Sequence, residues 1–174
     1  DPPCAGPQRW QLAALMHLHV LEQEQHLPIT LRDAWEFFSS PRNLDAITPP
    51  ELGFRIEHCP GERIYEGQII TYRVRVAPLT WIRWVTEIKS VDPDHAFVDE
   101  QRAGPYRFWH HRHSFEEVEG GVKMSDLVHY ALPFGPLGRI AHSLFVRRQL
   151  ERIFRFRNEV LAERFGTAPA GNLA

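Results

Sequence analysis

The spacing of apolar residues changes three times along the chain and predicts four successive blocks of structure. Residues 15–27 read as a strand, and residues 31–39 and 41–47 read as two short helices, the first of them capped by Thr30. Between residues 53 and 131 the period is two, and turn signals that contain proline or glycine cut the stretch into strands of an antiparallel meander. Residues 136–165 contain one glycine, near their start, and read as a long helix.

The apolar residues of that last helix do not form one stripe. Those of its first half lie on one side, whereas those of its second half, which include Ile153, lie nearly opposite. We therefore expect a kink or break near residues 143–146, with the second half packed on the sheet. Arg157 falls on the same side as Ile153, so we expect it to enter the interior or to pair with an inward acid such as Asp99.

The composition is that of one ordinary globular domain. The chain has 174 residues, of which 43% are hydrophobic and 24% charged, and its formal net charge of −2 gives no argument for nucleic-acid binding. No apolar run approaches the roughly 18 residues that span a bilayer, so we expect no stable membrane insertion and a cytoplasmic location. We place one domain at residues 16–166, between a flexible N-terminal segment, 1–15, and a frayed C-terminal end, 167–174.

The most informative stretch is a strand with three histidines, residues 108–115. Alternate residues of a strand share a face, and the aromatic rings at positions 109 and 115 favour an inward face made by Trp109, His111, His113 and Phe115. A hairpin turn at residues 119–120 sets the register of the next strand. It places Trp109 opposite Tyr130, His111 opposite Val128, His113 opposite Asp126 and Phe115 opposite Met124.

An inward pair of His113 and Asp126 suits several kinds of chemistry. The carboxylate holds the imidazole in one tautomer, which fits a general base, a donor that orients a ligand, or a purely structural buried pair. His111 and His113 also have the spacing by which a strand presents two imidazoles to one metal ion, with Asp126 or Asp99 as a third ligand. Spacing alone shows neither the third ligand nor a supporting shell, so we expect no bound metal and no cofactor.

Other strands supply apolar and aromatic walls. Where every second residue is polar or charged, the alternate residues should point inward, as in the sets Ile70, Tyr72 and Val74, and Ile82, Trp84, Thr86 and Ile88. Phe97, Asp99 and Gln101 form a third set, whose inward orientation would give the interior polar groups. Core packing of the aromatic rings is the alternative to contact with a ligand.

Three segments resemble one family of known proteins. They are FFSSPRNLDAITPPELGF at residues 37–54, FVDEQRAGPYRFWHHRHSFE at 97–116 and GGVKMSDLVHYALPFGPLGRIA at 120–141. They resemble the bacterial SRPBCC ligand-binding family, relatives of START domains and polyketide cyclases, and the likeness covers nearly all of residues 16–166. The resemblance implies an internal, mostly apolar cavity between sheet and helix, and it supplies neither a catalytic motif nor a substrate.

The order of the elements is that of the α+β helix-grip fold. In that fold a curved antiparallel sheet of six to seven strands surrounds a long C-terminal helix, with two short helices after the first strand. We expect this architecture for the whole domain.

Three functions agree with these observations. The first, which we favour over an enzyme, is a binding module that holds a small to medium hydrophobic molecule, such as a lipid, isoprenoid or polyketide-like compound, in the cavity. The second is an enzyme of the cyclase or dehydratase kind, in which His113 is the base, Asp126 orients it and Tyr130 donates a proton. The third is a protein-interaction or chaperone role for the arginine-rich face of the last helix. The candidate ligand-binding residues are Tyr72, Trp84, Thr86, Asp99, Trp109, His111, His113, Asp126, Tyr130, Ile153 and Arg157.

Overall fold

The structure is a computed structural model that describes residues 17–77, 79–134 and 145–167. Three expectations from the sequence therefore lie outside the described residues, wholly or in part. They are the flexible segment 1–15, the frayed end after residue 167, and the first half of the long helix with the beginning of its break.

Strands and helices follow one another in the predicted order. The described elements are β1 (His19–Leu27), α2 (Leu31–Phe38), the 3₁₀ turns η1 (Pro41–Leu44) and η2 (Pro50–Leu52), β2 (Arg55–His58), β3 (Ile69–Ala77), β4 (Thr80–Asp92), β5 (Ala96–Ala103), β6 (Phe108–Val118), β7 (Gly121–Ala131) and α4 (Arg147–Phe165). Thr30 caps α2 as expected, because its side chain accepts a hydrogen bond from the Asp33 amide. The second short helix, expected to reach residue 47, ends at Leu44, and a separate turn follows at η2. Within the described ranges, no helix is both long and apolar enough to cross a membrane.

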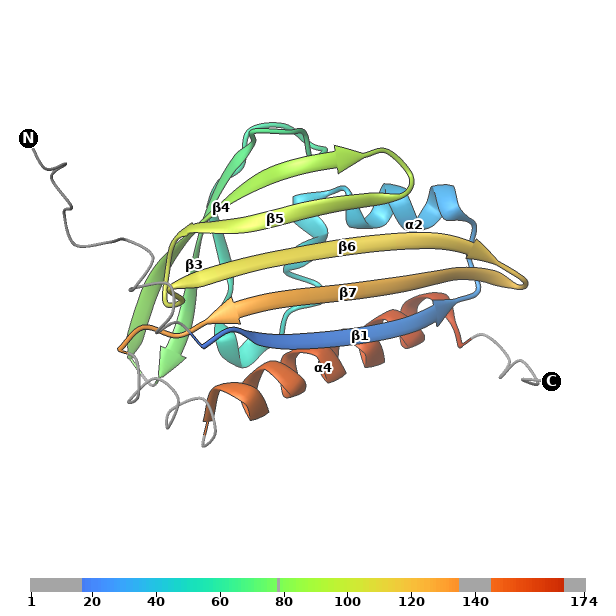
Figure 1. Cartoon of the computed structure of the whole chain (residues 1–174). Helices are drawn as coiled ribbons and strands as arrows, with labels where there is room; N and C mark the ends of the chain where they lie inside the picture. The colour runs from blue at the N-terminus through green and yellow to red at the C-terminus, as the bar shows by residue number, and fades with distance from the viewer. Residues whose placement is uncertain (1–16, 78, 135–144, 168–174) are drawn as a thin grey trace, which may run out of the picture.

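The strands form one curved sheet in the order β1-β7-β6-β5-β4-β3-β2, as Figure 1 shows. Strands β2 to β7 are a simple meander, and β1 joins its far edge beside β7. Every neighbouring pair is antiparallel. The predicted α+β helix-grip architecture is therefore confirmed, with seven strands among the described residues.

The predicted register between β6 and β7 is confirmed. Trp109 lies opposite Tyr130, His113 opposite Asp126 and Phe115 opposite Met124. A two-residue turn fixes this register, and the next residue, Gly121, has a φ of 150°. A β-carbon at Gly121 would collide with the backbone of β1, so only glycine fits there.

Helix α4 lies along the β1 side of the sheet in Figure 1. Its buried residues are Leu150, Phe154, Arg157 and Leu161, whose spacing of four, three and four keeps them on one face. Arg157 thus occupies a position in the apolar stripe, on the same side as its hydrophobic neighbours.

Two hydrophobic clusters flank the centre of the sheet. One contains Phe37, Phe115, Met124 and Leu161, and it packs under α2 and the C-terminal end of α4. The other contains Trp109, Val128, Tyr130, Leu150 and Phe154. On β6 and β7, the residues between these two clusters are polar, and they form the candidate site.

Leu161→Ala should lower the free energy of unfolding by about 2–5 kcal/mol, because the side chain is fully buried where α4 meets the first cluster. Urea denaturation followed by circular dichroism measures this loss. Glu163→Ala, on the exposed face of the same helix, is the matched control and should change stability by less than about 0.5 kcal/mol. Equal losses in the two variants would contradict the described packing of α4.

Candidate functional site

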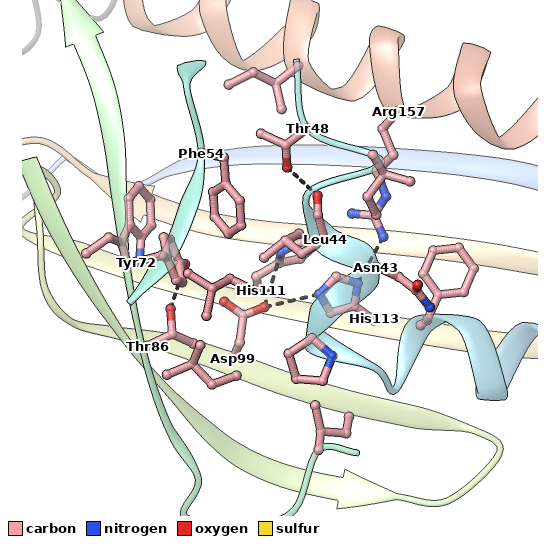
Figure 2. Close-up of a pocket in the computed structure, with 18 of the residues that line it drawn as sticks. Asn43, Leu44, Thr48, Phe54, Tyr72, Thr86, Asp99, His111, His113 and Arg157 are labelled. Carbon is pink, nitrogen blue, oxygen red and sulfur yellow. Dashed lines mark hydrogen bonds and ion pairs between the residues drawn. The ribbon is translucent and has the colours of Figure 1, made fainter. Parts of the chain in front are cut away.

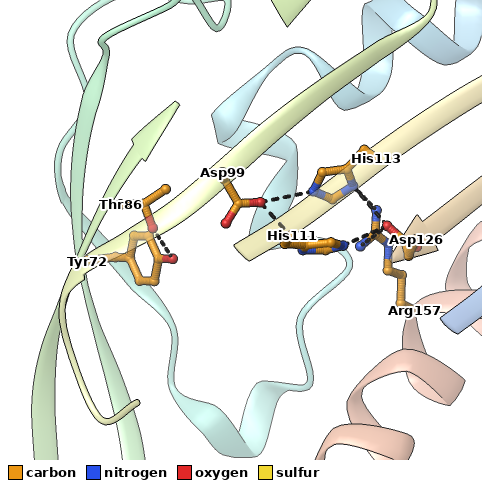
Figure 3. Close-up of polar contacts among 7 residues, drawn as sticks. All are labelled: Tyr72, Thr86, Asp99, His111, His113, Asp126 and Arg157. Atoms are coloured by element: carbon orange, nitrogen blue, oxygen red, sulfur yellow. Dashed lines mark hydrogen bonds and ion pairs between the residues drawn. The ribbon is translucent and has the colours of Figure 1, made fainter. Parts of the chain in front are cut away.

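Four elements bring five charged or titratable side chains together inside the protein, as Figure 3 shows. They are Asp99 of β5, His111 and His113 of β6, Asp126 of β7 and Arg157 of α4. The pleat explains the grouping on the sheet, because Asp99 is paired with His111, and His113 with Asp126, across neighbouring strands. The side chains of all but Asp99 are at least nine-tenths buried.

The two imidazoles lie between the two carboxylates. On one side, Nε2 of His111 and Nδ1 of His113 each lie 2.9 Å from the same oxygen, Oδ1 of Asp126. On the other side, Oδ2 of Asp99 lies 3.1 Å from Nε2 of His113 and 3.4 Å from Nδ1 of His111. All four ring nitrogens therefore face carboxylate oxygens, and the ring centroids are 3.8 Å apart.

Arg157 reaches this group from the helix. Its Nη1 lies 3.4 Å from Oδ1 of Asp126, and its Nη2 lies 3.5 Å from Nδ1 of His113. The guanidinium also lies over the rings of Phe38 and Phe154. The sequence predicted that Arg157 turns inward, and the acid that it meets is Asp126 rather than the suggested Asp99, because β7 lies nearer to α4 than β5 does.

The environment shifts the pKa values of the two histidines in opposite directions. Burial would lower the pKa of His113, but hydrogen bonds with Asp126 and Asp99 outweigh it and raise that pKa above its ordinary value. Burial and the neighbouring charge of His113 lower the pKa of His111, despite its hydrogen bond with Asp126. The geometry therefore favours a charged His113 beside a neutral His111.

Both carboxyl groups stay ionised despite their burial. Burial opposes the charge of Asp126, but the Arg157 guanidinium and hydrogen bonds with both histidines hold its pKa well below the ordinary range. For Asp99, burial is again opposed by His113 and His111, and its pKa is lowered.

A partly open cavity of about 230 Å³ adjoins this cluster. Figure 2 shows Asp99, His111, His113 and Arg157 among the side chains that surround it, together with Tyr72 and Phe54. Most of the remaining wall is apolar and comes from β3, β4, η1 and α4. Of the predicted ligand-binding residues, those in the wall are Tyr72, Trp84, Thr86, Asp99, Trp109, His111, His113, Ile153 and Arg157.

Two predicted site residues lie elsewhere. Asp126 is behind the histidines and does not line the cavity. Tyr130 faces the same side of the sheet, but it lies farther along β7, where it packs against Trp109 and Tyr106 in the second hydrophobic cluster. The proposed enzyme triad of His113, Asp126 and Tyr130 is therefore not assembled at the cavity, because position along the strand, and not only its face, decides which residues reach it.

A second polar group lies on the β3–β4 side of the cavity. The Tyr72 hydroxyl and Thr86 Oγ1 are 2.8 Å apart, and burial raises the pKa of Tyr72, so the phenol stays protonated. The indole N–H of Trp84 is buried and has no hydrogen-bond partner among the residues that the structure describes.

The sequence did not reveal one part of the wall. The segment from the end of α2 to the residues between η1 and η2 contributes Phe38, Asn43, Leu44 and Thr48 to the cavity. The polar side chains among them are satisfied locally, since Asn43 donates to the Phe37 carbonyl and Thr48 to the Leu44 carbonyl. Irregular backbone has no residue period, so no pattern in this segment indicates which side chains turn inward.

No protein-family model and no curated protein matches the sequence, but solved structures do match. Norcoclaurine synthase from Thalictrum flavum, solved in complex with dopamine and hydroxybenzaldehyde, has a TM-score of 0.64 at 13% identity, over 94% of this chain and 96% of its own. A protein from Chromobacterium violaceum has a TM-score of 0.63 at 12% identity, over 85% of this chain and 98% of its own. Ara h 8.0201 has a TM-score of 0.55 at 16% identity, over 84% of this chain and 99% of its own.

The chain has the helix-grip fold of the SRPBCC and Bet v1-like proteins. The fold that the resemblance implied is thereby confirmed. At these identities the likeness shows the fold alone and assigns no activity to the cluster or the cavity.

Asp126→Asn should lower the free energy of unfolding at neutral pH by about 3–5 kcal/mol, because it leaves Arg157 without its buried counter-ion. The pKa of Asp126 in the folded protein lies well below the ordinary value of 3.8, which applies to the unfolded chain. The carboxylate therefore stabilises the fold fully above about pH 3.8, and this stabilisation is lost as the pH falls from there toward the folded-state pKa. Urea denaturation at about pH 6 and about pH 3 should therefore show a smaller acid-induced loss in the variant than in the wild type.

Glu119→Gln, in the exposed turn of the same hairpin, is the control for the change of charge. It should alter stability by less than about 0.5 kcal/mol at either pH. An acid-induced loss of the same size in the wild type and in Asp126→Asn would exclude Asp126 as its source.

Proposed function

We propose that this protein binds a small, mainly hydrophobic molecule in the cavity between the sheet and α4. The observation that carries the proposal is the cavity itself, which is lined mainly by apolar and aromatic side chains and has polar groups at a few places. That combination is the general design of small-molecule sites, in which apolar walls supply affinity and few polar groups fix orientation.

The size of the cavity narrows the class of ligand. Pockets for drug-sized molecules measure about 300–1,000 Å³, and the space here, about 230 Å³, is smaller. A molecule of one or two rings fits this space better than a long acyl chain does. Among the hydrophobic ligands considered from the sequence, a small aromatic or polyketide-like compound is therefore favoured over a lipid.

The polar groups of the wall define what such a molecule should carry. On one side, the Tyr72–Thr86 pair offers hydroxyl groups. On the other side, Asp99 presents a carboxylate and Arg157 a guanidinium. A ring compound with a carbonyl or hydroxyl group toward Tyr72 and a second polar group toward Asp99 would satisfy both sides.

The comparison with norcoclaurine synthase supports this size class. That helix-grip protein was solved in complex with dopamine and hydroxybenzaldehyde, and both are single-ring aromatic compounds. For this chain, the comparison supports the size of the molecule that we propose and not its identity.

The arginine-rich surface of α4 is partly neutralised. Arg147 pairs with Glu151 of the same helix, and Arg152 pairs with Glu51 of η2. Exposed pairs of this kind are ordinary surface features. They do not favour the interaction or chaperone role over ligand binding.

Filling the cavity should weaken binding strongly without unfolding the protein. Ile153 lines the cavity from α4, and Ile153→Trp places a larger side chain into the space that a ligand would occupy. We expect 2-naphthol, a two-ring alcohol, to bind the wild type saturably in isothermal titration calorimetry. Its affinity for Ile153→Trp should be lower by tenfold or more, about 1.4 kcal/mol.

Arg155→Trp introduces the same side chain on the exposed face of the same helix and is the matched control. It should bind 2-naphthol like the wild type. Native mass spectrometry of the three proteins purified in parallel should show any co-purified molecule in the wild type and the control only. Binding that survives in Ile153→Trp, while circular dichroism shows it folded, would contradict the cavity as the site.

A further inference from the structure

The atoms of Asp99, His111 and His113 that face one another are arranged like the ligands of a metal ion. Asp99 Oδ2 lies 3.1 Å from Nε2 of His113 and 3.4 Å from Nδ1 of His111, and one such atom from each residue lies within 4.8 Å of the others. Tetrahedral zinc with bonds of about 2.1 Å holds neighbouring ligand atoms about 3.4 Å apart. The distances from the Asp99 oxygen to the two ring nitrogens, 3.1 and 3.4 Å, are close to this separation.

The backbone fixes these three residues in place. His111 and His113 are two residues apart on β6 and share its inner face. Asp99 lies on the neighbouring strand β5, directly opposite His111. Phe97 stacks on the His113 ring with centroids 4.1 Å apart, which holds that imidazole against the sheet. Ligands on paired strands in a packed interior give a site that needs little rearrangement to bind an ion.

The supporting contacts are those that metal-binding histidines have. A histidine ligand commonly donates its second ring N–H to a carboxylate, which sets the tautomer and the ring orientation. Here Nε2 of His111 and Nδ1 of His113 both lie 2.9 Å from Oδ1 of Asp126, so one carboxylate can orient both rings. Arg157 in turn holds Asp126 through an ion pair of 3.4 Å.

The same contacts determine what lies on the opposite side of the rings. A neutral His111 that donates its Nε2–H to Asp126 directs the lone pair of its Nδ1 toward the Asp99 carboxylate, and a charged His113 donates its Nε2–H to the same carboxylate. A lone pair that faces an anion is unfavourable unless a cation lies between them. A divalent ion that displaces the Nε2 proton of His113 would bind the two ring nitrogens and the Asp99 carboxylate together.

We propose that Asp99, His111 and His113 bind one divalent transition-metal ion. Two imidazoles and a carboxylate are ligands that suit Zn²⁺ and also Fe²⁺ or Co²⁺. All three residues line the cavity, whereas Asp126 does not, so the coordination positions that the protein leaves open face the cavity. The assignment rests on the cluster alone and holds whether or not the cavity binds a hydrophobic molecule.

The first test uses the metal alone on the full chain, after removal of metal with a chelator. Isothermal titration with Zn²⁺ should show one equivalent bound, and Co²⁺ should give the visible absorption bands of a site with low coordination number. Asp99→Asn and His111→Gln should each weaken Zn²⁺ binding by 100-fold or more. Asp126→Asn should retain the site with an affinity lower by about 10- to 100-fold, as expected for a residue that acts through the ligands.

Two variants test whether histidines outside the cluster bind the zinc. His110 lies on the same strand, and its Nδ1 is 3.1 Å from Oε1 of Glu100, so His110→Gln removes another histidine–carboxylate pair that is separate from the cluster. His17→Gln removes the exposed partner of the His17–His19 ring contact. Neither should change Zn²⁺ affinity. Zinc binding lost in His17→Gln but kept in Asp99→Asn would overturn the proposal.

A measurement on the wild type avoids any risk that a variant fails to fold. In ¹H–¹⁵N spectra of the imidazole rings, Zn²⁺ should shift Nδ1 of one histidine and Nε2 of another, with the proton on the remaining nitrogen of each ring. The assignment predicts His111 bound through Nδ1 and His113 through Nε2, two opposite tautomers. Saturating Zn²⁺ that leaves these two rings unchanged would refute the site.

Discussion

The buried charge of Asp126 is the constraint on which the arrangement of this protein depends. A carboxylate inside a protein costs several kcal/mol unless other groups compensate it, and here the compensation comes from two different elements. His111 and His113 of β6 contact one of its oxygens, and Arg157 of α4 reaches the same oxygen. The helix is therefore held on the sheet by a specific electrostatic contact at the centre of its apolar stripe, and a rotation of α4 by one residue would take the buried guanidinium away from Asp126.

That constraint also explains why the interior is divided. The polar residues of β6 and β7 separate two apolar clusters, one under α2 and one toward the start of α4. The cavity lies beside this polar group, and most of its wall is aromatic or aliphatic. The main polar places in that wall are the cluster itself, the Tyr72–Thr86 pair and the locally bonded Asn43 and Thr48.

The parts of the site that the sequence predicts are those fixed by short-range geometry. A two-residue turn determines the β6–β7 register, so the pairing of His113 with Asp126 follows from counting residues back from Gly120. The β5–β6 connection is longer, and register shifts interrupt the β4–β5 pairing, so no count along the chain places Asp99 beside His111. The acid that meets Arg157 depends on which strand lies nearest α4. Alternation predicts that Tyr130 is on the inner face, but it does not show how far the cavity extends along β7.

The position of the cluster has a consequence for whatever the cavity holds. Asp99, His111 and His113 line the cavity directly, so a cation among them and a molecule in the cavity would be in contact. Two species that bind in contact each change the other's affinity by the same factor, whatever its size. A molecule with a lone pair or negative charge toward Asp99 would bind more tightly with a divalent ion in place, since the ion neutralises that carboxylate. A purely apolar molecule would gain nothing, because it offers the ion no ligand and leaves its open positions without water.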